Sequence, residues 1–143
     1  MTVASILADK GRDVFTIAPD TLMSEVVDIL ALKKIGAMVV TEAGGKVCGI
    51  VSERDIVRDI ATRGAGVLDQ PISSCMTRKV VSCHERDTVD QVMTVMTENR
   101  FRHLPVIVDG KLSGIISIGD VVKRKIEMTV RDAEELRNYI AAG

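Results

Sequence analysis

Polar and apolar residues follow two matching series along the chain. In the first series, apolar residues recur at three- and four-residue steps from Leu22, and Gly36 ends the pattern, which predicts an amphipathic helix. A short β-prone run precedes this helix, and two apolar strands follow it around a glycine-containing hairpin. The other elements predicted in this series are strands at 14–17, 37–40 and 47–51 and a helix from about Glu53 to Arg63.

The same order of elements returns about 66 residues later. There the pattern predicts a strand at 80–83, a helix at 88–99 and strands at 104–108 and 114–117. The sequence Gly-Ile-Val-Ser at 49–52 matches Gly-Ile-Ile-Ser at 114–117. The chain therefore contains two copies of one strand-helix-strand-strand-helix unit, which we term the first and the second copy.

The duplication predicts the fold. A three-stranded sheet with both helices on one side leaves its other face to be covered, and the sheet of the other copy can cover it. We expect an α+β fold in which two β-α-β-β-α repeats pack sheet to sheet as a pseudo-twofold pair, with two related clefts between them. Short apolar turns at 3–7 and 72–76 lead into the two copies. The predicted domains are 1–66 for the first repeat with its lead-in, 67–128 for the second repeat with its lead-in, and 129–143 for a C-terminal helix whose apolar side needs a partner.

Composition narrows the possible functions. Hydrophobic residues make up 46% of the chain, but no apolar run approaches the roughly 20 residues of a membrane span, and the first residues do not resemble a secretory signal. We therefore expect a cytoplasmic protein that contacts no membrane. A formal net charge of −1 and very few aromatic residues argue against nucleic-acid binding. No metal site is expected, because His84 and the cysteines lack the spacing of metal ligands: Cys48, Cys75 and Cys83.

A Ser-x-x-Asp motif follows the last strand of each copy, at 52–55 and at 117–120. At the start of a helix, its carboxylate could accept two hydrogen bonds from a vicinal diol such as ribose, and the free backbone N–H groups suit an anion. The same pattern also forms a capping box in helices that bind nothing. Its presence at matching points of both copies favours a binding role.

Three cations, Arg100, Arg102 and His103, lie where the helix of the second copy meets its middle strand. They could complement the negative end of the helix dipole at a solvated helix end. Alternatively, since the apolar sequence Leu-Pro-Val follows at 104–106, they could lie on the rim of a cleft and contact phosphate.

The sequence Arg-His-Leu-Pro-Val at 102–106, the Asp-Gly-Lys turn at 109–111 and the sequence Gly-Ile-Ile-Ser-x-x-Asp at 114–120 together resemble the CBS domain, which occurs in tandem as a Bateman module. The resemblance covers about 14–58 and 80–123. It implies a pair of repeats that binds an adenosine-containing ligand such as AMP, ADP, ATP, NAD or S-adenosylmethionine. Members of this family mostly regulate other proteins, and they often form disc-shaped homodimers.

Carried over by position, the resemblance assigns ribose binding to Asp55 and Asp120, with Ser52 and Ser117 close to the ribose or phosphate. Thr16, Ser82, Leu104 and Pro105 would line the purine pocket, and the three cations of the second copy would meet phosphate. The full set of expected ligand-binding residues is Thr16, Ser52, Arg54, Asp55, Ser82, Arg100, Arg102, His103, Leu104, Pro105, Ser117, Ile118 and Asp120.

The first copy departs from this pattern, because it has Lys34, Gly36 and Ala37 where the second copy has its three cations. It has Arg54 where the second copy has Gly119, and Arg54 could serve its own pocket or reach toward a nucleotide held by the second copy. We expect two unequal sites, of which the one on the second copy is stronger for phosphorylated ligands. The leading hypothesis is a stand-alone adenine-nucleotide sensor that signals to an unknown partner in trans. A second hypothesis is an enzyme, but the sequence contains no G-x-S-x-G, P-loop, H-E-x-x-H or G-x-G-x-x-G motif, so we expect no catalytic activity. The alternative is a structural dimerisation module without a ligand.

Overall fold

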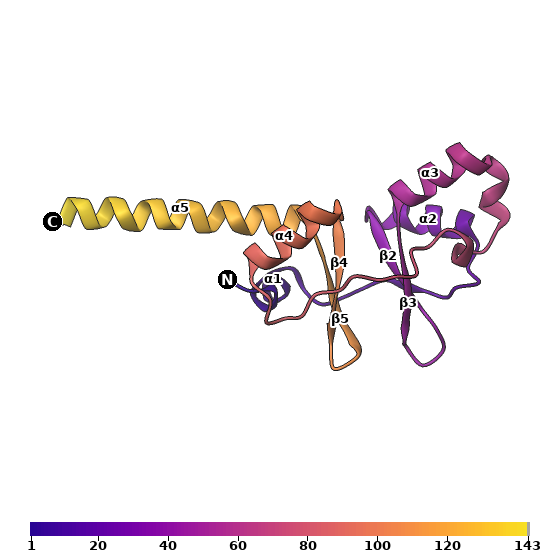
Figure 1. The fold of residues 1–143 in the computed structure, drawn as a ribbon, viewed down its shortest axis with the longest axis horizontal. Coiled ribbons are helices and arrows are strands. Elements are labelled where there is room, and N and C mark those ends of the chain that lie inside the picture. Colours follow the sequence, from indigo (N-terminus) through magenta and orange to yellow (C-terminus); the bar gives the residue numbers. More distant parts are fainter. Residues whose placement is uncertain (143) are drawn as a thin grey trace. The chain divides into compact units, whose positions relative to one another are not determined.

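The computed structural model describes residues 1–142 and divides the chain into two compact units (Figure 1). The first-copy unit consists of residues 13–82 and 107–113. The second-copy unit consists of residues 1–12, 83–106 and the chain from Gly114 onward. Each unit is mixed α/β, as the sequence predicts, and each is described by itself.

The first-copy unit contains a three-stranded sheet in the order β1-β2-β3. β1 is parallel to β2, with Thr16 opposite Val39, and β2 is antiparallel to β3, with Val39 opposite Ile50. Met23, Val26 and Met38 are fully or almost fully buried between the helices and the sheet. The elements are β1 (Thr16–Ile17), α2 (Met23–Lys33), β2 (Ala37–Thr41), β3 (Val47–Ser52), α3 (Glu53–Arg63) and the short 3₁₀ helices η1 (Ala65–Asp69) and η2 (Ile72–Ser74).

The second-copy unit contains most of β4 and the second half of β5, whose connecting residues 107–113 are grouped with the first-copy unit. Leu104, Val106 and Ile116 point into its core and are at most 1% exposed. Val92 and Met96 of the preceding helix are buried as well, which explains the three- and four-residue spacing of its apolar residues. The elements are α1 (Val3–Lys10), α4 (Val89–Asn99), β4 (His103–Val108), β5 (Lys111–Ser117) and α5 (Ile118–Ala142).

The lead-in of each copy packs on the other copy. α1 precedes the first copy in sequence, yet Thr2 pairs with Thr88 of the second, and the N–H of Val3 donates to the carbonyl of Asp87 at 2.9 Å. The lead-in of the second copy pairs with β3 of the first, where the N–H of Thr77 donates to the carbonyl of Ile50 at 2.9 Å. The domain ranges 1–66, 67–128 and 129–143 remain a prediction. The compact units differ from these ranges, because each unit contains the lead-in of the other copy.

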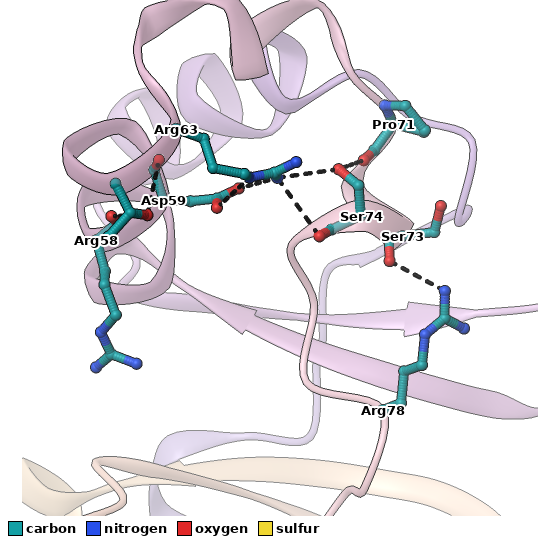
Figure 2. Close-up of polar contacts among 8 residues, drawn as sticks. Arg58, Asp59, Arg63, Pro71, Ser73, Ser74 and Arg78 are labelled. Atoms are coloured by element: carbon teal, nitrogen blue, oxygen red, sulfur yellow. Dashed lines mark hydrogen bonds and ion pairs between the residues drawn. The ribbon is translucent and has the colours of Figure 1, made fainter.

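Polar contacts hold the exchanged lead-in of the second copy in the first-copy unit (Figure 2). Arg63, in the last turn of α3, pairs with Asp59, and its Nε donates to Asp59 Oδ1 at 2.6 Å. The same guanidinium lies 3.5 Å from the carbonyl and the hydroxyl of Ser74. Arg78 donates to the carbonyl of Ser73 at 3.1 Å. One arginine on each side of η2 therefore fixes this segment.

The segment 80–83, predicted as a strand, forms only one parallel bridge, between Cys83 and Val106. In the first copy, the equivalent segment forms two pairs with β2. The pair of Ile17 and Val40 corresponds to the bridge at Cys83, and the pair of Thr16 and Val39 has no counterpart in the second copy. The residue equivalent to Val39 is Pro105, which has no N–H to donate and cannot complete a second bridge. The sheet of the second copy is therefore two-stranded, and the expected three-stranded sheet is wrong for this copy.

The C-terminal helix expected at 129–143 is present as the second half of α5 and is continuous with the last helix of the second repeat. α5 runs without interruption over 25 residues from Ile118 to Ala142, so the last helix of the second repeat continues directly into it. No proline interrupts this stretch, and its only glycine lies in the first turn of the helix, where it breaks nothing. Gly143, the final residue of the predicted range, lies outside the described residues.

The cysteines are free and partly or fully buried. Burial raises the pKa of the Cys83 thiol to about 12, and burial together with the charge of Asp59 raises that of Cys75 to about 11. Both are therefore protonated at neutral pH and poorly reactive. Among residues 1–142, no helix is long and apolar enough to cross a membrane, and no cluster of side chains could hold a metal ion.

Candidate functional site

The Ser-x-x-Asp motif of the first copy caps α3. The N–H of Ser52 donates to Asp55 Oδ2 at 2.9 Å, and the N–H of Asp55 donates to Ser52 Oγ at 3.3 Å. The Ser52 hydroxyl also donates to Asp55 Oδ2 at 2.9 Å. The N–H of Glu53 reaches the carbonyl of Gly36 at 3.0 Å, which ties the start of α3 to the start of β2. The capping box considered from the sequence is therefore present.

The motif of the second copy repeats this geometry at the start of α5. The N–H of Ser117 donates to Asp120 Oδ2 at 2.8 Å, and the N–H of Asp120 donates to Ser117 Oγ at 3.1 Å. The N–H of Ile118 donates to the carbonyl of Arg102 at 2.7 Å, as Glu53 does to Gly36 in the first copy. The structure thus brings together four of the predicted site residues: Arg102, Ser117, Ile118 and Asp120.

Asp120 also binds Lys10, a residue that the sequence analysis did not single out. The ammonium of Lys10 lies 2.7 Å from Asp120 Oδ2 and 3.0 Å from the carbonyl oxygen of Ile115. Within residues 1–142, the hydrogen bonds described for the Asp120 carboxylate go to Oδ2. Lys10 escaped the sequence analysis because it lies in the lead-in of the first copy, 110 residues from Asp120, and no signal in the sequence indicates that the lead-ins are exchanged.

These contacts set the ionisation of Asp120. Burial alone would raise its pKa, but the hydrogen bond from Lys10, the N–H of Ser117 and the positive charge of Lys10 outweigh this effect and hold the pKa below its usual value. A carboxyl with a lowered pKa stabilises the folded state above its unfolded-state pKa of about 3.9. That stabilisation is lost as the pH falls through the lower, folded-state pKa.

Replacing Lys10 with methionine is expected to raise the pKa of Asp120 and to lower the free energy of unfolding at pH 7 by up to about 1 kcal/mol. The loss is small because the two side chains are 34% and 25% exposed. It should vanish at an acid pH below the lowered folded-state pKa of Asp120, where this carboxyl is protonated in both proteins. Carbon-13 NMR titration of the Asp120 carboxyl and urea unfolding at both pH values measure the two effects.

Lys125→Met is the matched control for this experiment, because Lys125 pairs with Asp90 at 2.9 Å and does not contact Asp120. It should leave the titration of Asp120 unchanged. An Asp120 midpoint that is the same in wild type and Lys10→Met would show that the ion pair does not hold in solution.

The phosphate-binding candidates of the second copy lie at the end of α4 and the start of β4. Arg100 is the C-terminal cap of α4 and has a left-handed backbone with φ 57°. Lys34, its equivalent in the first copy, caps α2 with φ 54°. Both side chains are exposed, as is Arg102, while His103 is partly buried at the first position of β4. The three residues lie at one end of the hairpin, and their role remains a prediction.

The remaining candidates differ in burial. Leu104 and Pro105 are buried in β4, so they shape the core of the second-copy unit. Thr16 on β1 and Ser82 before the bridge at Cys83 are exposed, and Arg54 is exposed in the first turn of α3. The purine-lining role expected of Thr16, Ser82, Leu104 and Pro105 stays a prediction, and so does the separate role of Arg54.

A small cavity lies beside Asp120 in the second-copy unit. Its volume is about 110 Å³, well below the roughly 300 Å³ of small-molecule pockets, so it could hold only part of a nucleotide. It is lined by α1 and α5 through Ile6, Asp9, Lys10, Asp120, Lys123, Arg124 and Glu127.

Comparison with known proteins identifies the repeat. A family model of the CBS domain matches residues 4–62 and 72–127. The CBS domain-containing protein CBSX3, mitochondrial, of Arabidopsis thaliana is 29% identical over 150 residues, which cover 99% of this chain and 73% of that protein.

Solved structures agree with this match. The CBS-domain containing protein ATU1752 from Agrobacterium tumefaciens is 51% identical with a TM-score of 0.85, over 87% of this chain and 92% of that one. The CBS domain pair of protein MJ0100, solved in complex with 5′-methylthioadenosine and S-adenosyl-L-methionine, is 25% identical with a TM-score of 0.79, over 90% of this chain and 98% of that one. The resemblance seen in the motifs at 102–106 and 114–120 is thus confirmed, and the chain belongs to the CBS-domain family, with two CBS domains in tandem.

Proposed function

We propose that this protein is a regulatory module that binds an adenosine-containing ligand through the Ser-x-x-Asp motifs of its two CBS domains. The observation that carries the proposal is the shared geometry of the two motifs. In each, a strand ends at the serine, and the serine N–H donates to the aspartate carboxylate in the first turn of the next helix. In the second copy, the hydrogen bonds described for the Asp120 carboxylate within residues 1–142 go to Oδ2, so a ribose hydroxyl could donate to Oδ1 without disturbing the cap.

The ligand class is supported by the CBS domain pair of protein MJ0100, which was solved with two different ligands. Methylthioadenosine and S-adenosylmethionine share the adenosine group and differ at the 5′ substituent. Recognition of the ribose diol by a carboxylate would serve both. AMP, ADP, ATP and NAD carry the same diol, and they remain the ligands that we expect from the sequence.

The two sites are proposed to be unequal. Asp120 is paired with Lys10, which places a cation beside the ribose position of the second copy. No cation among residues 1–142 is paired with Asp55, whose carboxylate accepts from the hydroxyl and the N–H of Ser52. The cations at 100–103 adjoin the same motif, since the carbonyl of Arg102 accepts from the N–H of Ile118. The second copy is therefore the better candidate for a ligand with a negative 5′ group. The first copy contributes Arg54, whose target remains a prediction.

The proposed output is regulation and not catalysis. A ligand that binds one conformation more tightly shifts the population toward it, and a partner protein could respond to that change. Location of the ligand between the two repeats, a homodimer and a cytoplasmic location are the expectations from the sequence that complete this proposal. In the alternative, a structural module without a ligand, both Ser-x-x-Asp motifs act only as helix caps.

A nucleotide panel on the wild type and Asp120→Ala tests the proposal. Adenosine, AMP, ATP, NAD and S-adenosylmethionine are titrated by calorimetry, and the best ligand is then used in thermal unfolding. A ligand at a hundredfold its dissociation constant should stabilise the wild type by about 2.7 kcal/mol. Asp120→Ala should lose about 10- to 100-fold in affinity, because a hydrogen bond to a charged group is worth about 1.5–3 kcal/mol.

Two controls isolate the ribose contact. Asp90→Ala removes an exposed carboxylate that also pairs with a lysine, and it should bind the ligand as the wild type does. The wild type should bind the 2′-deoxy form of the best ligand more weakly than the ribose form. Asp120→Ala should bind the two forms with equal affinity, because it lacks the carboxylate that distinguishes them. If no nucleotide binds, the proposal is wrong and the structural module without a ligand is favoured. If wild type and Asp120→Ala prefer the ribose form over the 2′-deoxy form to the same extent, Asp120 does not bind the ribose.

A further inference from the structure

The ammonium of Lys10 already binds the carboxylate that the proposed function assigns to the ribose. It lies 2.7 Å from Asp120 Oδ2 and 3.0 Å from the carbonyl oxygen of Ile115. The N–H of Ser117 donates to the same carboxylate oxygen at 2.8 Å. A ligand that donates hydrogen bonds to Asp120 therefore meets a negative charge that a cation of the chain already neutralises.

The two lead-ins carry a lysine at the same place, three residues after the end of each apolar turn: Lys10 and Lys79. In the first lead-in, α1 stays helical through Lys10, and the ammonium reaches Asp120. In the second lead-in, the 3₁₀ helix η2 ends before the lysine, and the chain continues in an extended pairing with β3. Lys79 is exposed, and no ion pair joins it to Asp55 within residues 1–142. The same residue type thus gives a paired cation to the motif of the second copy and none to that of the first.

α1 does not depend on Lys10 for its position. Leu7 is 1% exposed, and Arg124 of α5 donates to the carbonyl of Ser5 at 3.0 Å. The side chain of Lys10, by contrast, is 34% exposed and has a flexible stem. Its ammonium can therefore leave Asp120 while α1 stays packed on its unit.

The small cavity between α1 and α5 provides space beside this ion pair. Lys10 and Asp120 line it together with Lys123 and Arg124. Its volume of about 110 Å³ is that of fewer than four water molecules at about 30 Å³ each, so it admits a small charged group and not a nucleoside. Arg124 is paired with Asp9, whereas the exposed Lys123 forms no ion pair with the described residues 1–142. The cavity thus leaves room for the head of Lys10 to turn toward an anion.

We propose that Lys10 selects the ligand of the second copy by charge, an inference that rests on the proposed ribose contact of Asp120. Lys10 competes with an uncharged nucleoside for the Asp120 carboxylate. When a nucleotide binds, the Lys10 ammonium moves to its 5′ phosphate, and the ribose diol takes the place of the ammonium at Asp120. The ligand class of this site is therefore a nucleoside 5′-phosphate.

The balance of charges gives the physical reason. Uncharged adenosine would displace Lys10 from Asp120 and return the ammonium to water without a new partner. A phosphate monoester carries about −1.5 to −2 charges at neutral pH, more than a carboxylate, so it compensates Lys10 for the lost ion pair. The 5′ phosphate is joined to the same ribose through one methylene group, which keeps it within reach of the long lysine stem.

Calorimetry with AMP and adenosine on wild type and Lys10→Met tests the proposal. Wild type should prefer AMP, and Lys10→Met should lose at least about tenfold of this preference, because a hydrogen bond between charged groups is lost. Adenosine itself should bind Lys10→Met more tightly than wild type by up to about fivefold, since a partly exposed ion pair no longer competes for Asp120. Phosphorus-31 NMR titration of bound AMP gives a second readout. The phosphate pKa should be lower on wild type than on Lys10→Met, because the ammonium favours the doubly charged phosphate.

Lys125→Met is the matched control, because it also removes one positive charge, and Lys125 pairs with Asp90 at 2.9 Å. It should keep the wild-type preference for AMP. A wild type without this preference, the same preference in Lys10→Met, or weaker binding of adenosine to Lys10→Met would each overturn the role of Lys10.

Asp120→Ala separates this result from a failure of the proposed function. If Asp120→Ala weakens the binding of both ligands while Lys10→Met keeps the wild-type preference, only the role of Lys10 is wrong. If Asp120→Ala binds both ligands as the wild type does, the ribose contact is wrong, and the role of Lys10 is wrong with it.

Discussion

Replacement of Leu7 by alanine is expected to lower the free energy of unfolding by about 3 kcal/mol, within the range of about 2–5 kcal/mol for buried leucines. Leu7 is 1% exposed in α1, and its side chain packs over Gly114 of β5. The substitution would leave a cavity between the N-terminal helix and the sheet of the second copy. For a domain of this size, the melting temperature should fall by about 9 °C.

Urea unfolding of wild type and Leu7→Ala measures this loss. Leu32→Ala provides the control, because the 79% exposed Leu32 should contribute less than about 0.5 kcal/mol. A loss below about 1 kcal/mol for Leu7→Ala would mean that α1 is not an integral part of the second-copy unit in solution.

Local sequence patterns predicted most of the elements. Ser52 and Ser117 end their strands and begin their helices where expected, because a capping residue acts on the few backbone groups beside it. α3 was predicted from Glu53 to Arg63, and those are its bounds. Such features depend only on neighbours along the chain.

The features that the sequence did not predict depend on contacts between distant segments. The strand expected at 80–83 requires a donor from the neighbouring strand, and Pro105 supplies none. The contact of Lys10 with Asp120 requires that α1 packs on the other copy. A repeat gives the order of elements along the chain, but it does not show on which copy a lead-in packs.

The exchange of lead-ins gives a physical reason for the glycine that both copies share. A Cβ at Gly114 would lie 2.7 Å from Leu7 Cδ2, and a Cβ at Gly49 would lie 2.5 Å from Met76 Sδ. Leu7 and Met76 are the last residues of the two apolar lead-in turns at 3–7 and 72–76. Each copy thus keeps a glycine where the corresponding residue of the exchanged lead-in crosses its last strand.

Gly49→Val is accordingly expected to destabilise the protein by about 2–3 kcal/mol, the upper part of the usual cost of overpacking. The side chain of Met76 is flexible and could move away from the new Cβ. The carbonyl oxygen of Thr77, however, would lie 3.1 Å from it and belongs to the backbone that pairs with Ile50. Because valine favours strands, a loss of stability could not be explained by its β-propensity. The loss would instead result from the close contact between the lead-in and β3.

Gly119→Ala is the matched control for Gly49→Val in urea unfolding. A Cβ at Gly119 would meet only the hydroxyl of Ser117, at an ordinary 3.6 Å, and alanine favours the first turn of α5. This variant should be neutral or more stable by up to about 1 kcal/mol. If Gly49→Val were as stable as Gly119→Ala, the lead-in would not cross β3 closely. If instead only Gly49→Val loses stability, the shared glycine serves the exchange of lead-ins, and the CBS motif carries a packing requirement beside its proposed ligand role.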